Sequence, residues 1–147
     1  MNVDQEGDKA DVHADAGKLP FPDEYADYVC AIHIIEHFYR WEVPEVLAEW
    51  KRVLKPGGRI VLELPCMDKI YLYIAQTIYE QKKLLERMTV MAFWGDPRQK
   101  SEAAHHRWGY TIAEMQGILM KVGFRNVEYQ NPRYHHMLRD MRFEAVK

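Results

Sequence analysis

The chain has 147 residues, of which 48% are hydrophobic and 29% are charged. These values predict a single globular domain, residues 1–147, with enough apolar side chains for one core. The formal net charge of −2 gives no electrostatic basis for binding nucleic acid or an acidic membrane surface. No apolar run reaches the ~18 residues of a membrane span, and the polar N-terminus does not resemble a secretory signal. We therefore expect a cytoplasmic protein that binds neither nucleic acid nor membranes.

The first half of the chain has the pattern of strands followed by one helix. Continuous apolar runs predict parallel strands that are covered on both faces, and spacings of three and four predict an amphipathic helix. The expected elements are strands over residues 10–15, 28–32 and 59–64, and a helix over residues 43–54 that ends at Lys55-Pro56-Gly57-Gly58. Cys30 and Cys66 lie inside apolar runs, so we expect two buried, reduced thiols.

The second half begins with helical spacing over residues 67–87, and an irregular segment covers residues 94–110. Thr111 and Glu114 form a capping-box pattern at the start of a helix that Gly123 ends. Two final strands are expected over residues 126–129 and 141–146. Strands that alternate with helices predict an α/β fold, and two last strands without a helix between them predict an antiparallel strand at one edge.

An ordered set of short motifs runs through most of the chain. It consists of DAGKLPFPD from Asp15, AD at Ala26, EH at Glu36, LAE at Leu47, RVLKPGG from Arg52, WGYT from Trp108 and VGF from Val122. The set resembles small bacterial class I methyltransferases that use S-adenosylmethionine. The resemblance implies a Rossmann-like, mostly parallel sheet and methyl transfer to a small molecule, a sugar or a lipid.

The resemblance also implies which residues contact the cofactor. Asp4, at the end of a strand over residues 2–4, would accept hydrogen bonds from the ribose hydroxyls, although it is also compatible with a solvated terminal aspartate. Asp15 would accept from the adenine amino group, and the backbone of Ala16 would face the adenine ring. Asp15 is also compatible with a turn-capping role. His33 would lie near the sulfonium end of the cofactor.

Methyl transfer needs mainly alignment of the donor with the acceptor, and it needs a base only when the acceptor must lose a proton. His37 is the first candidate for that base, and His33 is the second. The alternative is that Glu36 and His37 orient the neighbouring helix.

The sequence contains no glycine-rich turn before Asn2, where the family normally has its first strand and the turn that contacts the cofactor tail. We therefore expect a domain truncated at its N-terminus, weak or lost cofactor binding, and a sheet without its usual central strand. A homo-oligomer or a partner chain would complete such a sheet.

Two other hypotheses compete with a methyltransferase. One is a non-catalytic scaffold or fragment of the same fold that needs a partner chain. The other is a zinc peptidase, because His33-Ile34-Ile35-Glu36-His37 matches the H-x-x-E-H pattern. The zinc hypothesis lacks an evident third ligand, and we expect no metal ligands in the chain.

Overall fold

A computed structural model describes residues 1–5, 8–101 and 104–147. In chain order its elements are β1 (Val3–Asp4), β2 (Val12–His13), β3 (Ala26–Ile32), η1 (Ile35–His37), α1 (Val43–Val53), β4 (Leu54–Pro65), α2 (Met67–Tyr79), η2 (Glu86–Met88), α3 (Val90–Trp94), α4 (Ile112–Val122), β5 (Arg125–Gln130) and β6 (Asp140–Val146).

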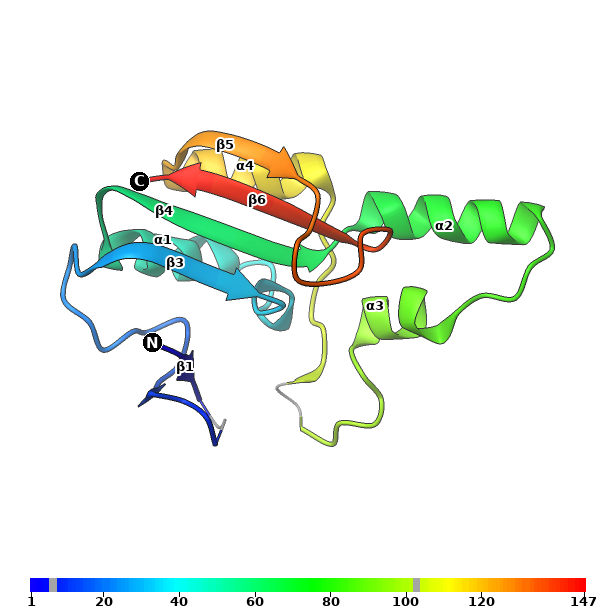
Figure 1. Cartoon of the computed structure of the whole chain (residues 1–147), viewed down its shortest axis with the longest axis horizontal. Helices are drawn as coiled ribbons and strands as arrows, with labels where there is room; N and C mark the ends of the chain where they lie inside the picture. The colour runs from blue at the N-terminus through cyan, green and yellow to red at the C-terminus, as the bar shows by residue number, and fades with distance from the viewer. Residues whose placement is uncertain (6–7, 102–103) are drawn as a thin grey trace.

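The main sheet has four strands in the order β3-β4-β6-β5 (Figure 1). β3 and β4 are parallel, whereas β6 is antiparallel to both of its neighbours. This confirms the predicted α/β fold, with parallel and antiparallel strands in one sheet. The antiparallel strand lies one position inside the edge, because β5 pairs with its outer side.

β1 and β2 form a separate two-stranded parallel sheet, with Val3 opposite Val12. Among the described residues, no strand links this small sheet to the free edge of β3. The prediction that Cys30 is buried is wrong: Cys30 is exposed on β3, whereas Cys66 is buried. The physical reason is that Cys30 points away from the core face on which Ala31 lies, and no described strand pairs with the outer edge of β3.

Two helices cover one face of the main sheet. α1 and α4 lie side by side behind the strands in Figure 1, and they contact each other. The core between these helices and the sheet includes Leu47 and Trp50 of α1, Leu119 of α4, and Leu62 and Phe143 of the strands. The sheet and the two helices thus form a rigid frame for the loops at the carboxyl ends of β3 and β4.

The ends of α4 largely follow the sequence prediction. The Thr111 hydroxyl accepts a hydrogen bond from the amide of Glu114 at 3.2 Å, and Gly123 takes a left-handed φ of 92°. The Glu114 carboxylate instead pairs with Arg40 at 2.7 Å, so only half of the capping box forms.

The junction between α1 and β4 differs from the prediction. The helix ends at Val53, and Leu54 is already extended and paired with Ala26. The Lys-Pro-Gly-Gly segment therefore lies within β4 rather than between a helix and a strand. A register shift between Ala26 and Tyr28, with Gly57 at a φ of 77°, accommodates it.

The predicted helix over residues 67–87 is shorter than expected. α2 ends at Tyr79, and Gln81 has a left-handed φ of 52°. Residues 80–86 are all exposed, so further helix there would bury nothing. Met67, Ile70 and Ala92 form a second, small core between α2 and α3. No helix in the described part of the chain is long and apolar enough to cross a membrane.

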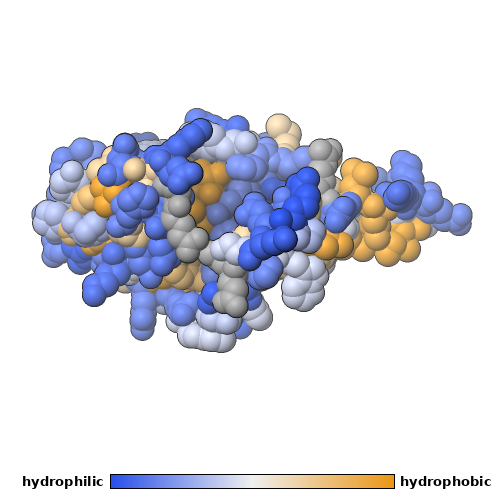
Figure 2. Space-filling model, turned by 90° about the horizontal axis from the view of Figure 1, so that it is seen from below, coloured by the Kyte–Doolittle hydropathy of each residue, from blue (hydrophilic) through white to orange (hydrophobic). Residues whose placement is uncertain are grey.

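The far end of α2 projects beyond this small core. Figure 2 shows apolar side chains at this end of the molecule, seen from below Figure 1. Leu72, Ile78 and Leu85 are among the exposed large apolar side chains of this region.

Candidate functional site

A hollow of about 360 Å³ lies beyond the carboxyl ends of β1 and β3. It is lined by Val3, Asp4, Gln5, Ala14, Asp15, Ala16, Ile34, His37, Phe38, Glu42 and Arg107. Asp4, Asp15, Ala16 and His37, four of the residues proposed from the sequence, therefore lie around one hollow. His33 is not among its lining residues. The carboxyl ends of strands are where open α/β sheets bind their ligands.

A tight turn holds Asp15 and Ala16 in place. The Asp15 Oδ1 atom accepts a hydrogen bond from the Gly17 amide at 2.7 Å, so the predicted turn-capping role is present. The Ala16 carbonyl accepts a hydrogen bond from the Trp50 indole at 2.7 Å. Trp50 is buried in α1, so the helix fixes the position of the turn at the edge of the hollow.

The loop after this turn is fixed by an ion pair on α1. Glu49 and Arg52 lie one turn apart, with the Arg52 Nε atom 2.7 Å from the carboxylate. Glu49 accepts from the amide of Leu19 at 2.8 Å, and Arg52 donates to the carbonyl of Phe21 at 2.8 Å. The hydrogen bond to Arg52 lowers the pKa of Glu49. These motif residues hold the loop in place and do not line the hollow.

His33 follows β3 and has a left-handed φ of 53°. Its Nδ1 atom lies 2.6 Å from Glu36 Oε1, and its Nε2 atom lies 3.5 Å from Asp140 Oδ2. Burial alone disfavours the protonated ring, but the hydrogen bonds to Asp140 and Glu36 outweigh burial and raise the pKa of His33 to about 9. A ring that is protonated at neutral pH is a poor general base.

η1 positions His37 at the hollow, and it also holds the segment that contains Arg107. The Glu36 carbonyl accepts hydrogen bonds from the amides of Arg107 at 2.7 Å and Trp108 at 3.3 Å. The rings of His37 and His106 meet edge to face, 5.0 Å between centroids. Sequence analysis did not identify His106 as a site residue, because it lies far from His37 along the chain and belongs to no periodic pattern.

The backbone does not support a zinc peptidase built on H-x-x-E-H. That pattern requires two histidines on one face of a helix. The segment Ile35–His37 is instead a short 3-10 turn, and His33 precedes it in a left-handed conformation. His33 contacts Asp140, whereas His37 contacts His106, so the two rings have different partners.

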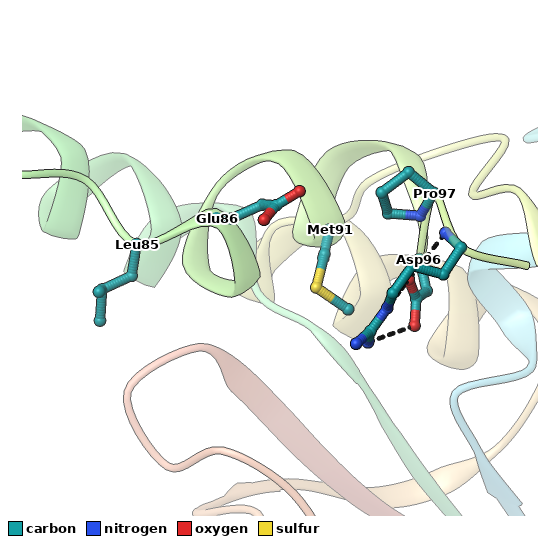
Figure 3. Close-up of a pocket in the computed structure, with 6 residues that line it drawn as sticks. Leu85, Glu86, Met91, Asp96 and Pro97 are labelled. Carbon is teal, nitrogen blue, oxygen red and sulfur yellow. Dashed lines mark hydrogen bonds and ion pairs between the residues drawn. The ribbon is translucent and has the colours of Figure 1, made fainter.

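Other hollows among the described residues lie outside this group. A hollow of about 470 Å³ is lined by Leu85, Glu86, Met91, Asp96, Pro97 and Arg98 (Figure 3). The Asp96 carboxylate there is paired with Arg98 at 2.6 Å, which lowers the pKa of Asp96 to about 2 and leaves it little capacity for chemistry. A groove of about 360 Å³ separates β1 from β3, and Val3, Tyr28, Cys30 and Trp50 are among its lining residues.

Known proteins match both the sequence and the fold. Residues 2–62 match the family model described as "Methyltransferase domain". A ubiquinone/menaquinone biosynthesis C-methyltransferase of Vibrio campbellii is 31% identical over 124 residues, which cover 82% of this chain and 46% of the relative.

Solved structures show the same architecture. A SAM-dependent methyltransferase from Archaeoglobus fulgidus superposes with a TM-score of 0.66 at 20% identity, covering 99% of this chain and 74% of that one. Human N-acetylserotonin methyltransferase, solved in complex with SAM, gives a TM-score of 0.59 at 15% identity, covering 92% of this chain and 32% of that one.

The fold and the place of the hollow define an α/β domain of the class I methyltransferase type. The solved structures thus show the class I methyltransferase fold, and the family model and the relatives show that the sequence is similar to methyltransferases. This confirms the resemblance carried by the motifs. The chain spans about half the length of the curated relatives that it matches.

Proposed function

We propose that the chain binds S-adenosylmethionine in the hollow at the ends of β1 and β3 and takes part in methyl transfer to a small-molecule acceptor. The observation that supports this most strongly is the shared position of Asp4, Asp15, Ala16 and His37 around that hollow. These residues come from three separate segments of the chain.

The lining residues fit the nucleoside part of the cofactor. Asp4 and Asp15 offer carboxylate oxygens, which accept hydrogen bonds from ribose hydroxyls and from the adenine amino group. Val3 and Phe38 offer apolar surface to the adenine ring, and the backbone of Ala16 borders the same space. When bound, the cofactor supplies an electrophilic methyl group on a good leaving group.

The acceptor would enter at the end of the hollow where His37 and Arg107 lie. His37 is the candidate base for an acceptor that must lose a proton. The names of the relatives favour a carbon atom of a quinone-type ring as the methylated position. A panel of hydroxylated aromatic and quinone acceptors with radiolabelled cofactor would test this assignment.

Isothermal titration of the purified chain with S-adenosylhomocysteine tests cofactor binding directly. Asp15→Asn keeps an oxygen that can cap the turn but removes the charge, whereas Asp15→Ala removes both. Asp27→Asn is the matched control, because it makes the same change at an exposed position outside the hollow. We expect both Asp15 variants to weaken binding by about tenfold, or ~1.4 kcal/mol, and the control to leave it unchanged.

The outcomes separate three cases. Weakening in both Asp15 variants supports the adenine contact. Weakening in Asp15→Ala alone assigns Asp15 to the turn, and contradicts the proposed contact. Absence of binding at millimolar ligand contradicts cofactor binding by this chain.

The groove beside β3 favours a second candidate function, a scaffold of the same fold that needs another strand. Such a strand would cover exposed residues such as Tyr28 and Cys30. Gel filtration combined with light scattering tests whether a second copy supplies it. A monomer at all concentrations would contradict self-association.

A further inference from the structure

Three potential metal-binding side chains converge where η1 meets the segment before α4. One ligand atom each from Glu36, His37 and His106 lies within 4.8 Å of the other two. Two ligands on a tetrahedral zinc ion lie about 3.4 Å apart, given bond lengths of about 2.0–2.1 Å. Small side-chain rotations would therefore bring the three atoms to binding distance.

The hydrogen bonds of the two histidines fix which ring nitrogen is available. His37 Nδ1 lies 3.1 Å from the His105 carbonyl oxygen, and His106 Nδ1 lies 3.0 Å from the Ala92 carbonyl oxygen. A carbonyl oxygen can only accept, so each Nδ1 carries the proton. In the neutral rings, both Nε2 atoms then have a free lone pair. Histidines that bind metals are commonly oriented in this way by a backbone carbonyl.

The buried carboxylate of Glu36 supports a cation at this position independently of the histidines. Its residue is 1% exposed, and its Oε2 atom has no hydrogen-bond partner among the described residues. Leaving a buried carboxylate oxygen without a partner is costly, and coordination of a cation would satisfy that oxygen. The other oxygen, Oε1, contacts His33 at 2.6 Å and lies 3.9 Å from His106 Nε2.

We propose that Glu36, His37 and His106 together bind one divalent transition-metal ion. Two imidazoles and one carboxylate suit zinc and its first-row neighbours better than magnesium or calcium, which prefer oxygen ligands. Three protein ligands leave at least one position open, as in zinc sites that also bind water or a substrate.

The metal site adjoins the hollow proposed for the cofactor, so a ligand at the open coordination position would lie near that hollow. His37 also lines the hollow proposed for the cofactor, and Arg107 directly follows His106. An oxygen ligand, either water or an acceptor hydroxyl, would bind there. The proposal makes His37 a metal ligand instead of a base, and it goes beyond the proposed function because metal binding needs no cofactor.

Titration of the untagged, metal-free chain with Zn²⁺ tests the site, with Co²⁺ absorption as a second readout of the ligand geometry. We expect one equivalent to bind with micromolar affinity or tighter. His106→Ala should weaken binding at least tenfold. His105→Ala is the matched control, because that ring is exposed and only its backbone carbonyl supports His37. It should bind as the unmodified chain does.

Folding is checked for each variant by circular dichroism. If His106→Ala does not fold, His37→Ala replaces it, since His37 is only partly buried. Binding weaker than about 1 mM, or equal weakening in His105→Ala, would overturn the proposal. The result is independent of the titration with S-adenosylhomocysteine, so failure of one does not imply failure of the other.

Discussion

Asp140 is a fully buried carboxylate that is held by charged and polar neighbours. Arg139 donates to both of its oxygens, at 2.6 and 2.8 Å, and His33 lies 3.5 Å from Oδ2. Burial alone would raise the pKa of Asp140, but the hydrogen bonds from His33 and Arg139 outweigh it and hold that pKa well below its ordinary value. The hydrogen bond to Asp140 also raises the pKa of His33, so the two residues form one ion pair.

Replacing Asp140 by Asn should lower the free energy of unfolding at pH 7 by about 2–4 kcal/mol, because it leaves buried cationic groups without their counter-ion. A depressed carboxyl pKa stabilises the fold fully above the unfolded-state value of 3.8, and this contribution is lost as the pH falls further. The difference between Asp140→Asn and the unmodified chain should therefore shrink below pH 3.8. Urea unfolding at about pH 7, 5 and 3 measures it, and a constant difference over this range would contradict the ionic explanation.

At the scale of the elements, β4 and α4 each contain a glycine, and the two differ in how closely they are packed. Gly58 near the start of β4 is tightly surrounded, whereas Gly117 in α4 has open space around it. A Cβ atom on Gly58 would lie 2.9 Å from the Lys55 carbonyl oxygen and 3.2 Å from that of Asp27, and both of these neighbours are backbone. A Cβ atom on Gly117, in the middle of α4, would meet nothing within 4 Å. The same substitution should thus have opposite effects in the two elements.

Gly58→Ala should destabilise the protein by about 1–3 kcal/mol, because the backbone at the register shift must move. Gly117→Ala should stabilise it by about 0.5–1 kcal/mol, because alanine loses less conformational freedom than glycine in a helix. Thermal unfolding of the two variants beside the unmodified chain measures both effects. Equal effects in the two variants would show that the close approach at Gly58 does not constrain the fold.

At the scale of the whole molecule, the two cysteines differ in solvent exposure, because β3 is an edge strand and β4 is a central one. Cys30 is exposed beside the groove, and Cys66 is buried where β4 meets α2. Partial burial raises the pKa of both thiols. Because the thiolate is the reactive form, the reaction is best followed at about pH 8–9, where enough thiolate is present to compare the two rates.

We expect the Cys30 thiol to react rapidly with a disulfide reagent in the native chain, and the Cys66 thiol to react only after unfolding. Cys30→Ser should abolish the rapid phase, whereas Cys66→Ser should keep it. A strand from a second copy would protect Cys30 increasingly as the protein concentration rises. Two slow thiols at every concentration would contradict an open groove.

Local sequence patterns were sufficient to predict the fold class and most of the elements. Apolar runs and helical spacing are properties of short segments, so β3, α1, α4 and β6 could be predicted from them. The predictions were wrong where packing decides the outcome. α2 ends at Tyr79, and residues 80–86 after it are all exposed. Cys30 is exposed because it lies on the sheet face that α1 and α4 do not cover, on a strand with no described neighbour at its outer edge.

The composition of the candidate site depends on contacts between distant segments, and these are visible only in the folded chain. The resemblance pointed to Asp4, Asp15 and Ala16, and the structure places all three around one hollow with His37. It also separates His33 from them, since the ionic contacts with Glu36 and Asp140 hold that ring elsewhere. Backbone hydrogen bonds between segments far apart in the chain bring His106 to η1, and no local pattern encodes such contacts.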